Sequence, residues 1–142
     1  MKPYTSYDTD YYQWINETVE NLRNRNFTEV DWENLIEEIE SMGKSEKRAL
    51  LSLLTRLLEH LIKLAYWKSE QERNRNHWAA EVVNFRIQIK TIIEDSPSLR
   101  SQLGTFYHKA YPSAVKSVSK LFTLPPEAEI DLTQALDEDW FP

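Results

Sequence analysis

A short acidic segment near the start of the chain carries the side chains best suited to chemistry. Glu33 and Glu37 are four residues apart, and Glu37 and Glu40 are three apart. On a helix such neighbours share one surface, where unpaired carboxylates repel one another and a divalent cation can bridge them. This spacing raises the hypothesis of a metal-dependent hydrolase that acts on a nucleotide or nucleic acid with Mg²⁺ or Mn²⁺. Its candidate catalytic residues are Glu33, Glu37, Glu38 and His60.

The surroundings of these carboxylates favour a structural interpretation. The run Glu-Glu-Ile-Glu at 37–40 differs from the Glu-Glu-x-x-Glu pattern of helical nucleotide pyrophosphatases, and no second Glu-x-x-Asp pair follows at a suitable distance. On a helical wheel Glu33, Glu37 and the binding candidate Asn34 lie opposite the apolar arc, as on a solvated face. His60 lies beside an apolar arc, where a histidine is typically a hydrogen-bonded edge residue. The sequence therefore favours a protein that is not an enzyme, and outside the hydrolase hypothesis it predicts no cofactor.

Residue types that are absent or scarce exclude several other chemistries. The chain has no cysteine, which removes disulfides, thiolate metal sites and thiol nucleophiles. Its two glycines, Gly43 and Gly104, cannot form a Walker loop or a dinucleotide fingerprint, because each needs glycines close together. A di-iron bundle needs Glu-x-x-His, and none of the three histidines has a carboxylate three residues before it. No serine–histidine–aspartate pattern is visible either.

A basic segment between residues 73 and 90 supplies a third hypothesis, nucleic-acid binding. Arg73 and Arg75 alternate with asparagines ahead of Trp78, and Arg86 follows near the stripe of the same predicted helix. Arginines can neutralise a phosphate backbone, and a tryptophan can stack on a base. Trp78, however, fits the apolar stripe as a core residue, and a pI of about 5.1 is unusual for a nucleic-acid-binding protein. Nucleic acid is therefore a less favoured partner than protein.

Charge changes sign twice along the chain. Residues 1–42 have 3 basic and 10 acidic side chains, and residues 43–122 have 14 basic and 7 acidic ones. Residues 123–142 have 6 acidic side chains and no basic one. The favoured interpretation is that acidic and basic surfaces complement each other within one fold. The alternative is a basic binding face that the acidic tail partly screens.

Apolar residues recur at intervals of three and four, which indicates an all-α fold. The predicted helices span about residues 8–24, 32–42 and 46–67, with a fourth that begins at 74–76 and a fifth that begins at 96–97. Pro112 is predicted to kink or interrupt the fifth, because its ring clashes with the carbonyl of His108. One further turn is predicted near 132–136. The third of these helices is apolar around about half its circumference and is predicted to lie at the centre.

The clearest local signals surround the second predicted helix. Asp31 is a suitable N-cap, Gly43 a suitable C-terminal stop, and Ser45 a suitable cap for the next helix. Together they predict a tight turn that makes the second and third helices spatial neighbours. Two apolar stripes are predicted to face the core, one on each of the first two helices: Tyr12, Ile15, Val19 and Leu22, and then Trp32, Leu35, Ile36, Ile39 and Met42.

Length and hydropathy predict one helical domain over residues 1–142, with its core at about 8–122 and a tail at 123–142. The predicted architecture is a single compact bundle of about five helices. Its short acidic tail is anchored by the aromatic residues Trp140 and Phe141. No stretch resembles a signal peptide or a membrane span, so we expect a soluble, cytoplasmic protein without membrane contact.

Several of these segments also resemble a known family in order and spacing. They are Asp31–Gly43, the leucine-rich segment through His60, Ser96-Pro97-Ser98-Leu99, Ala110-Tyr111 and the closing Trp140-Phe141-Pro142. They look like the bacterial family called domain of unknown function 29, found mostly in cyanobacteria. The chain departs from that family at 130–132, where members often carry Cys-Pro-Trp. The resemblance implies an all-helical fold along essentially the whole chain and no assigned activity.

With these exclusions, binding is the function that the sequence favours most. We expect a helical interaction or assembly module that binds a protein partner or a second copy of itself. The positive indications are the exposed aromatic residues of the tail and an aromatic cluster near the start of the chain. Together they exceed what one short helix needs for its own packing, and tyrosine and tryptophan are enriched at interfaces. That cluster consists of Tyr4, Tyr7, Tyr11, Tyr12 and Trp14.

Overall fold

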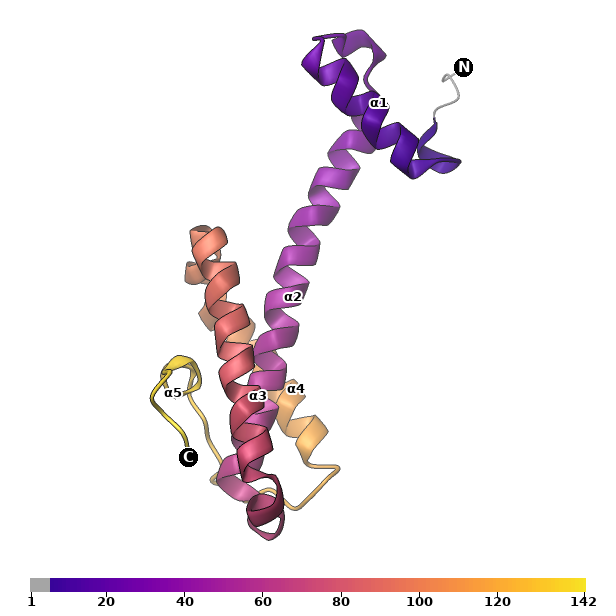
Figure 1. Cartoon of the computed structure of the whole chain (residues 1–142). Coiled ribbons are helices and arrows are strands. Elements are labelled where there is room, and N and C mark those ends of the chain that lie inside the picture. The colour runs from indigo at the N-terminus through magenta and orange to yellow at the C-terminus, as the bar shows by residue number, and fades with distance from the viewer. Residues whose placement is uncertain (1–5) are drawn as a thin grey trace. The chain divides into compact units, whose positions relative to one another are not determined.

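The computed structural model describes residues 6–142, and all regular structure in that range is helical (Figure 1). The α-helices are α1 (Tyr11–Arg23), α2 (Trp32–Tyr66), α3 (Lys68–Asp95), α4 (Leu103–Val118) and α5 (Leu132–Leu136). Three short 3₁₀ helices accompany them: η1 (Ser6–Asp8), η2 (Phe27–Glu29) and η3 (Pro97–Gln102). The predicted all-α fold is therefore confirmed. Contacts group the chain into two compact units, Met1–Ser45 and Glu46–Pro142, and the single domain expected from length stays a prediction.

The predicted break at Gly43 is wrong, because α2 runs without interruption from Trp32 to Tyr66. No glycine in the described residues has the positive φ of a helix-ending residue. A glycine inside a helix costs only about 1 kcal/mol relative to alanine, which the helix-forming residues on both sides can offset. Ser45 is consequently an interior residue rather than a cap, and no tight turn separates two helices here. Asp31 does act as predicted, since its Oδ1 accepts the backbone N–H of Asn34 at 3.3 Å.

In the first unit, α1 begins later than predicted and buries a different face. Asp10 caps it, with its Oδ1 accepting the backbone N–H of Gln13 at 3.0 Å. The buried residues are Trp14 and Thr18, whereas Tyr12 and Val19 of the predicted stripe are exposed. The ring of Trp14 packs against Tyr7 at 4.9 Å and against Tyr11 at 5.9 Å, centroid to centroid. This aromatic packing decides which face of α1 turns inward. Tyr4, the remaining tyrosine ahead of it, lies outside the described residues.

The second unit is built around one hydrophobic core contributed by α2, α3 and α4. Leu57, Leu58 and Leu61 on α2 are fully buried there, which agrees with the central position predicted for this segment. α3 begins at Lys68, earlier than the predicted 74–76. Asn74 lies inside the helix, and its Nδ2 donates to the carbonyl of Glu70 one turn back. α4 continues through Pro112, so the predicted interruption does not occur.

The tail is held to the second unit by tyrosine hydroxyls as well as by its own aromatic residues. Tyr107 donates to the carbonyl of Ile130 at 2.5 Å, and Tyr111 donates to the carbonyl of Ala128 at 3.1 Å. Burial is the main reason that the pKa of Tyr107 rises to about 12, which keeps this hydroxyl a donor. Trp140 packs against the hydrophobic core. The anchored tail and the turn at Leu132–Leu136 are therefore confirmed.

Candidate functional site

The carboxylate of Glu38 is the acceptor of a pair of tyrosine hydroxyls in the first unit. Tyr7 donates to Oε1 at 2.5 Å and Tyr11 donates to Oε2 at 2.6 Å. The hydrogen bond from Tyr11 is the main cause that lowers the pKa of Glu38, and the bond from Tyr7 is the second. Desolvation acts in the opposite direction. In return, the hydrogen bond to Glu38 is the main reason that the pKa of Tyr7 rises to about 12. Glu38 thus fastens η1 and α1 to α2.

The other candidates for catalysis are not brought together around Glu38. Glu33 and Glu37 are exposed on α2, and the side chain of Asn34 donates to Asp31 at 2.6 Å as part of the helix cap. His60 belongs to the second unit. In residues 6–142 no group of three or more potential ligands among His, Asp and Glu could hold a metal ion. Within the described residues, Asp31 and Asn34 therefore form a helix cap and Glu38 accepts the tyrosine hydroxyls, whereas Glu33 and Glu37 lie on the exposed surface of α2.

His60 occupies an edge position in the second unit, as its place on the helical wheel predicts. Its Nδ1 lies 2.8 Å from the carbonyl oxygen of Arg56, and its ring packs edge-on against Phe85 at 5.2 Å between centroids. Desolvation is the main cause that lowers the pKa of His60. The neutral imidazole is therefore favoured at neutral pH.

The basic segment of α3 divides between surface and core. Arg73 is exposed, and Arg75 donates from Nη2 to the carbonyl of Pro142 at 3.2 Å. Trp78 is buried and stacks on Trp67 at 5.7 Å between ring centroids. Its core position, the interpretation favoured by the sequence, leaves no exposed ring face for stacking on a base. Lys90 pairs with Glu138 at 3.3 Å, so part of the acidic tail does lie against the basic middle of the chain.

Arg86 is a buried cation, which its sequence position alone did not indicate. Only 5% of its surface is exposed. Nε donates to the carbonyl of Ala135 at 2.8 Å and Nη2 to that of Gln134 at 3.2 Å, at the C-terminal end of α5. The Gln134 carbonyl also accepts the backbone N–H of Asp137 at 3.3 Å, and a cation is favoured at that end of a helix. The guanidinium also lies 5.0 Å from the ring centroid of Phe141.

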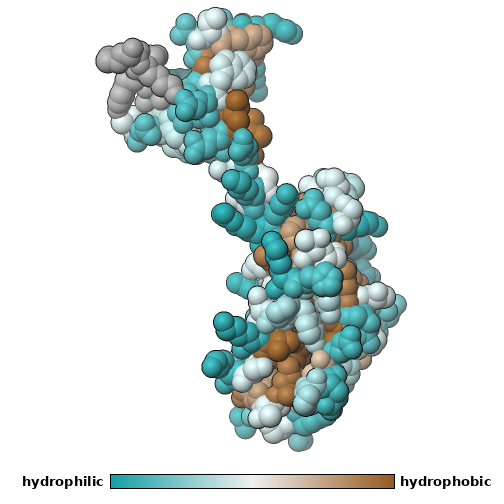
Figure 2. Space-filling model, turned by 180° about the vertical axis from the view of Figure 1, so that it is seen from behind, coloured by the Kyte–Doolittle hydropathy of each residue, from teal (hydrophilic) through white to brown (hydrophobic). Residues whose placement is uncertain are grey.

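An exposed apolar face in the first unit is the functional feature that the sequence analysis missed. Ile36 and Ile39 are each 54% exposed and Met42 is 62% exposed, although their stripe predicted a place in the core. That prediction is wrong for these side chains, because no described element of the first unit covers them. Figure 2 shows hydrophobic residues reaching the surface of this unit as well as of the second. We call Trp32, Ile36, Ile39 and Met42 the α2 stripe.

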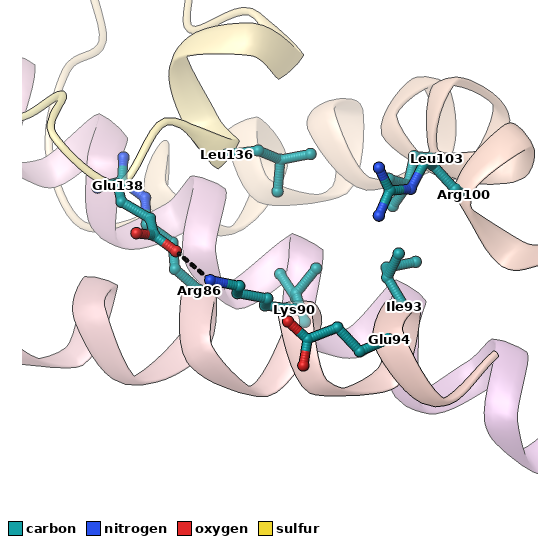
Figure 3. A pocket seen from close by; sticks show the side chains of 9 residues that line it. Arg86, Lys90, Ile93, Glu94, Arg100, Leu103, Leu136 and Glu138 are labelled. Carbon is teal, nitrogen blue, oxygen red and sulfur yellow. Dashed lines mark hydrogen bonds and ion pairs between the residues drawn. The ribbon is translucent and has the colours of Figure 1, made fainter. Parts of the chain in front are cut away.

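The second unit contains a cavity of about 400 Å³ between α3, η3, the start of α4 and the tail (Figure 3). Its lining combines four apolar side chains with the charged side chains of Arg86, Lys90, Glu94, Arg100 and Glu138. In Figure 3 the Lys90–Glu138 pair lies at one end and Arg100 at the other. No sequence signal indicated this cavity, because its residues come from four segments.

The described residues form an all-helical protein. They include the exposed α2 stripe, the cavity of the second unit and the buried contacts that hold the tail. The chain belongs to the family described as domain of unknown function DUF29, whose model matches residues 6–141. The family resemblance inferred from the sequence is therefore confirmed. No curated protein and no solved structure matches the chain. None of the helices in the described range is both long enough and apolar enough to cross a membrane.

Proposed function

We propose that this protein is a helical interaction module whose first unit binds a protein partner through the α2 stripe. The observation that carries the proposal is the exposure of Ile36, Ile39 and Met42, each more than half exposed on successive turns of one helix. Scattered apolar residues are ordinary on a surface, but a contiguous stripe is typical of interaction sites. An amphipathic helix of a partner can bury such a stripe through contacts at three- and four-residue spacing.

The charge of the first unit indicates what kind of partner fits. Residues 1–45 contain 4 basic and 10 acidic side chains. Glu33, Glu37 and Glu40 stand on the same helical segment as the stripe. A partner with basic side chains around an apolar helix face complements this surface, whereas a second copy docked face to face brings like charges together. A basic, helical protein is therefore the occupant we propose.

A pair of matched double variants tests the proposal. Ile36→Ser with Ile39→Ser removes the centre of the stripe, and Val83→Ser with Ile87→Ser removes two comparably exposed apolar residues from the second unit. A protein captured on the wild type is identified and purified, and its affinity for each variant is measured by calorimetry. We expect the stripe variant to bind at least about tenfold more weakly, because two buried contacts are lost, and the control to bind as the wild type does.

Sedimentation of the wild type and both variants separates the possible occupants. A dimer that only the stripe variant abolishes identifies a second copy as the occupant and contradicts the basic-partner proposal. A monomer whose partner binds both double variants equally well contradicts the role of the stripe altogether.

A further inference from the structure

The cavity of the second unit has the dimensions and lining of a small-molecule site. Its volume of about 400 Å³ falls within the range typical of ligand pockets. Ile89 and Ile93 of α3 form one wall, and Leu103 and Leu136 contribute from α4 and α5. Ligand sites commonly combine such apolar walls with a few polar groups that fix orientation.

Arg86 supplies a cationic group at one end of the cavity. Its Nε and Nη2 are used on the carbonyls of α5, but its buried Nη1 has no hydrogen-bond partner among residues 6–142. A buried donor without an acceptor is costly, and a guanidinium is well suited to a carboxylate. Lys90 adds a second cation from the next turn of α3. This end of the cavity therefore favours an anionic group.

The tail already places one carboxylate at this end. Glu138 lies 3.3 Å from the Nζ of Lys90, and Figure 3 shows the two side chains joined across the cavity edge. Burial lowers the pKa of Arg86, while the charges of Asp137 and Glu138 act in the opposite direction, so these carboxylates are within electrostatic reach of the guanidinium. The side chains of Lys90 and Glu138 are 60% and 66% exposed. An ion pair this exposed is weak, so another carboxylate can replace it at little cost.

We propose that this cavity binds a small carboxylate with an apolar body. The carboxylate takes the place of Glu138 beside Lys90 and Arg86, and the apolar body lies between Ile93 and Leu136. Arg100 and Glu94, which carry opposite charges, stand farther along the cavity. Glu138 thus acts as an internal competitor that occupies the position of the ligand's head group.

Calorimetric titration of the full chain with octanoate tests the chemistry. Octanol, which has the same apolar body without the charge, and acetate, which has the charge without the body, are the matched controls. We expect octanoate to bind at one saturable site and at least about tenfold more tightly than either control, because octanol lacks the charge-assisted hydrogen bonds and acetate lacks the apolar contacts. Equal binding of octanoate and octanol overturns the proposal, and so does no binding of octanoate.

Two exposed positions locate the head group without disturbing the core. Lys90→Gln is expected to weaken octanoate binding by up to about fivefold, the limit for an exposed ion pair, and Glu138→Gln is expected to strengthen it, because the internal competitor is removed. Lys109→Gln, which changes an exposed cation of α4 outside the cavity, is the control and is expected to leave binding unchanged. If Lys90→Gln and Lys109→Gln behave alike, the head group does not lie where we propose.

Discussion

The two units of this protein use one helix in opposite ways. In the second unit, α2 buries Leu54, Leu57 and Leu61 completely against α3 and α4. In the first unit, the same helix leaves Ile36 and Ile39 more than half exposed. The apolar periodicity is similar in both halves, but within the first unit no described element covers Ile36 or Ile39.

The polar contacts of the two units also differ in burial, and those of the second unit are the more buried. The second unit uses buried or half-buried groups, such as Arg86 and Tyr107, to satisfy main-chain carbonyls of the tail. The first unit relies on hydroxyl–carboxylate bonds from Tyr7 and Tyr11 to Glu38, near solvent. Because stability follows buried area and satisfied buried groups, we infer that the second unit carries most of the folding free energy. The first unit is then free to present a surface.

Truncation of a core leucine is expected to have the largest effect on the free energy of unfolding. Leu57→Ala leaves a cavity in the second unit and is expected to lower the free energy of unfolding by about 2–5 kcal/mol. Ile39→Ala on the α2 stripe is expected to change it by less than about 0.5 kcal/mol, because little burial is lost and alanine favours the helix. Urea denaturation followed by circular dichroism measures both. Comparable losses from the two variants contradict the exposure of the stripe.

A smaller effect is expected where the tail is fastened to α3. Arg86→Met keeps an apolar stem but removes the donors to Gln134 and Ala135, which is expected to cost about 1–3 kcal/mol because the buried carbonyl of Ala135 loses its partner. Hydrogen exchange of the amides in α5 and urea denaturation measure the change. Arg75→Met, at an exposed position with one bond to Pro142, is the control and is expected to cost less than about 0.5 kcal/mol. Unaltered exchange in α5 of Arg86→Met contradicts the capping role.

The carboxylate of Glu38 predicts a pH dependence specific to the first unit. Hydrogen bonds from Tyr11 and Tyr7 lower its pKa in the folded state, so its stabilising contribution is present above the ordinary glutamate pKa and is lost as the pH falls through the folded value. Glu38→Gln is therefore expected to flatten the loss of stability in acid. The pKa of Tyr7 is raised to about 12, so its contribution is present below the ordinary value of 10.0 and is lost as the pH rises toward 12.

Two measurements with one control check this dependence. Denaturation midpoints across the acid range test Glu38, and tyrosinate absorbance across the alkaline range tests Tyr7. Glu38→Gln is expected to return the pKa of Tyr7 toward its ordinary value, because the hydrogen bond to Glu38 is the main cause of the shift. Glu37→Gln changes an exposed neighbour on the same helix and is expected to have a much smaller effect. Identical titrations of the two variants contradict the tyrosine–carboxylate contact.

The sequence predicted the helical elements better than it predicted what covers them. The three- and four-residue spacing identified the helices and the core leucines, because periodicity reports directly on an amphipathic face. It could not show that the face bearing Ile36 and Ile39 remains uncovered, since burial depends on neighbours distant in sequence. The same limit explains Glu38 and Arg86, whose partners lie 27 and 49 residues away in the chain. Local signals misled at Gly43, Asn74 and Pro112, where the helix continues through a residue that often starts or ends one.

Substitution of Gly43 is expected to have the smallest effect on the free energy of unfolding. The sign of that effect distinguishes a continuous α2 from a turn at this position. In a continuous α2 its φ is not positive, and a Cβ added there meets no heavy atom within 4 Å. Gly43→Ala is therefore expected to stabilise the chain by about 1 kcal/mol, because alanine is the better helix former. A helix-ending glycine in the left-handed region would instead make alanine unfavourable by about 1–2 kcal/mol. Urea denaturation and helicity distinguish these outcomes, with Gly104→Ala, at an equally open position in α4, as the control within the second unit. Stabilisation by both variants supports the uninterrupted helix, whereas destabilisation by Gly43→Ala alone restores a turn between Met42 and Ser45.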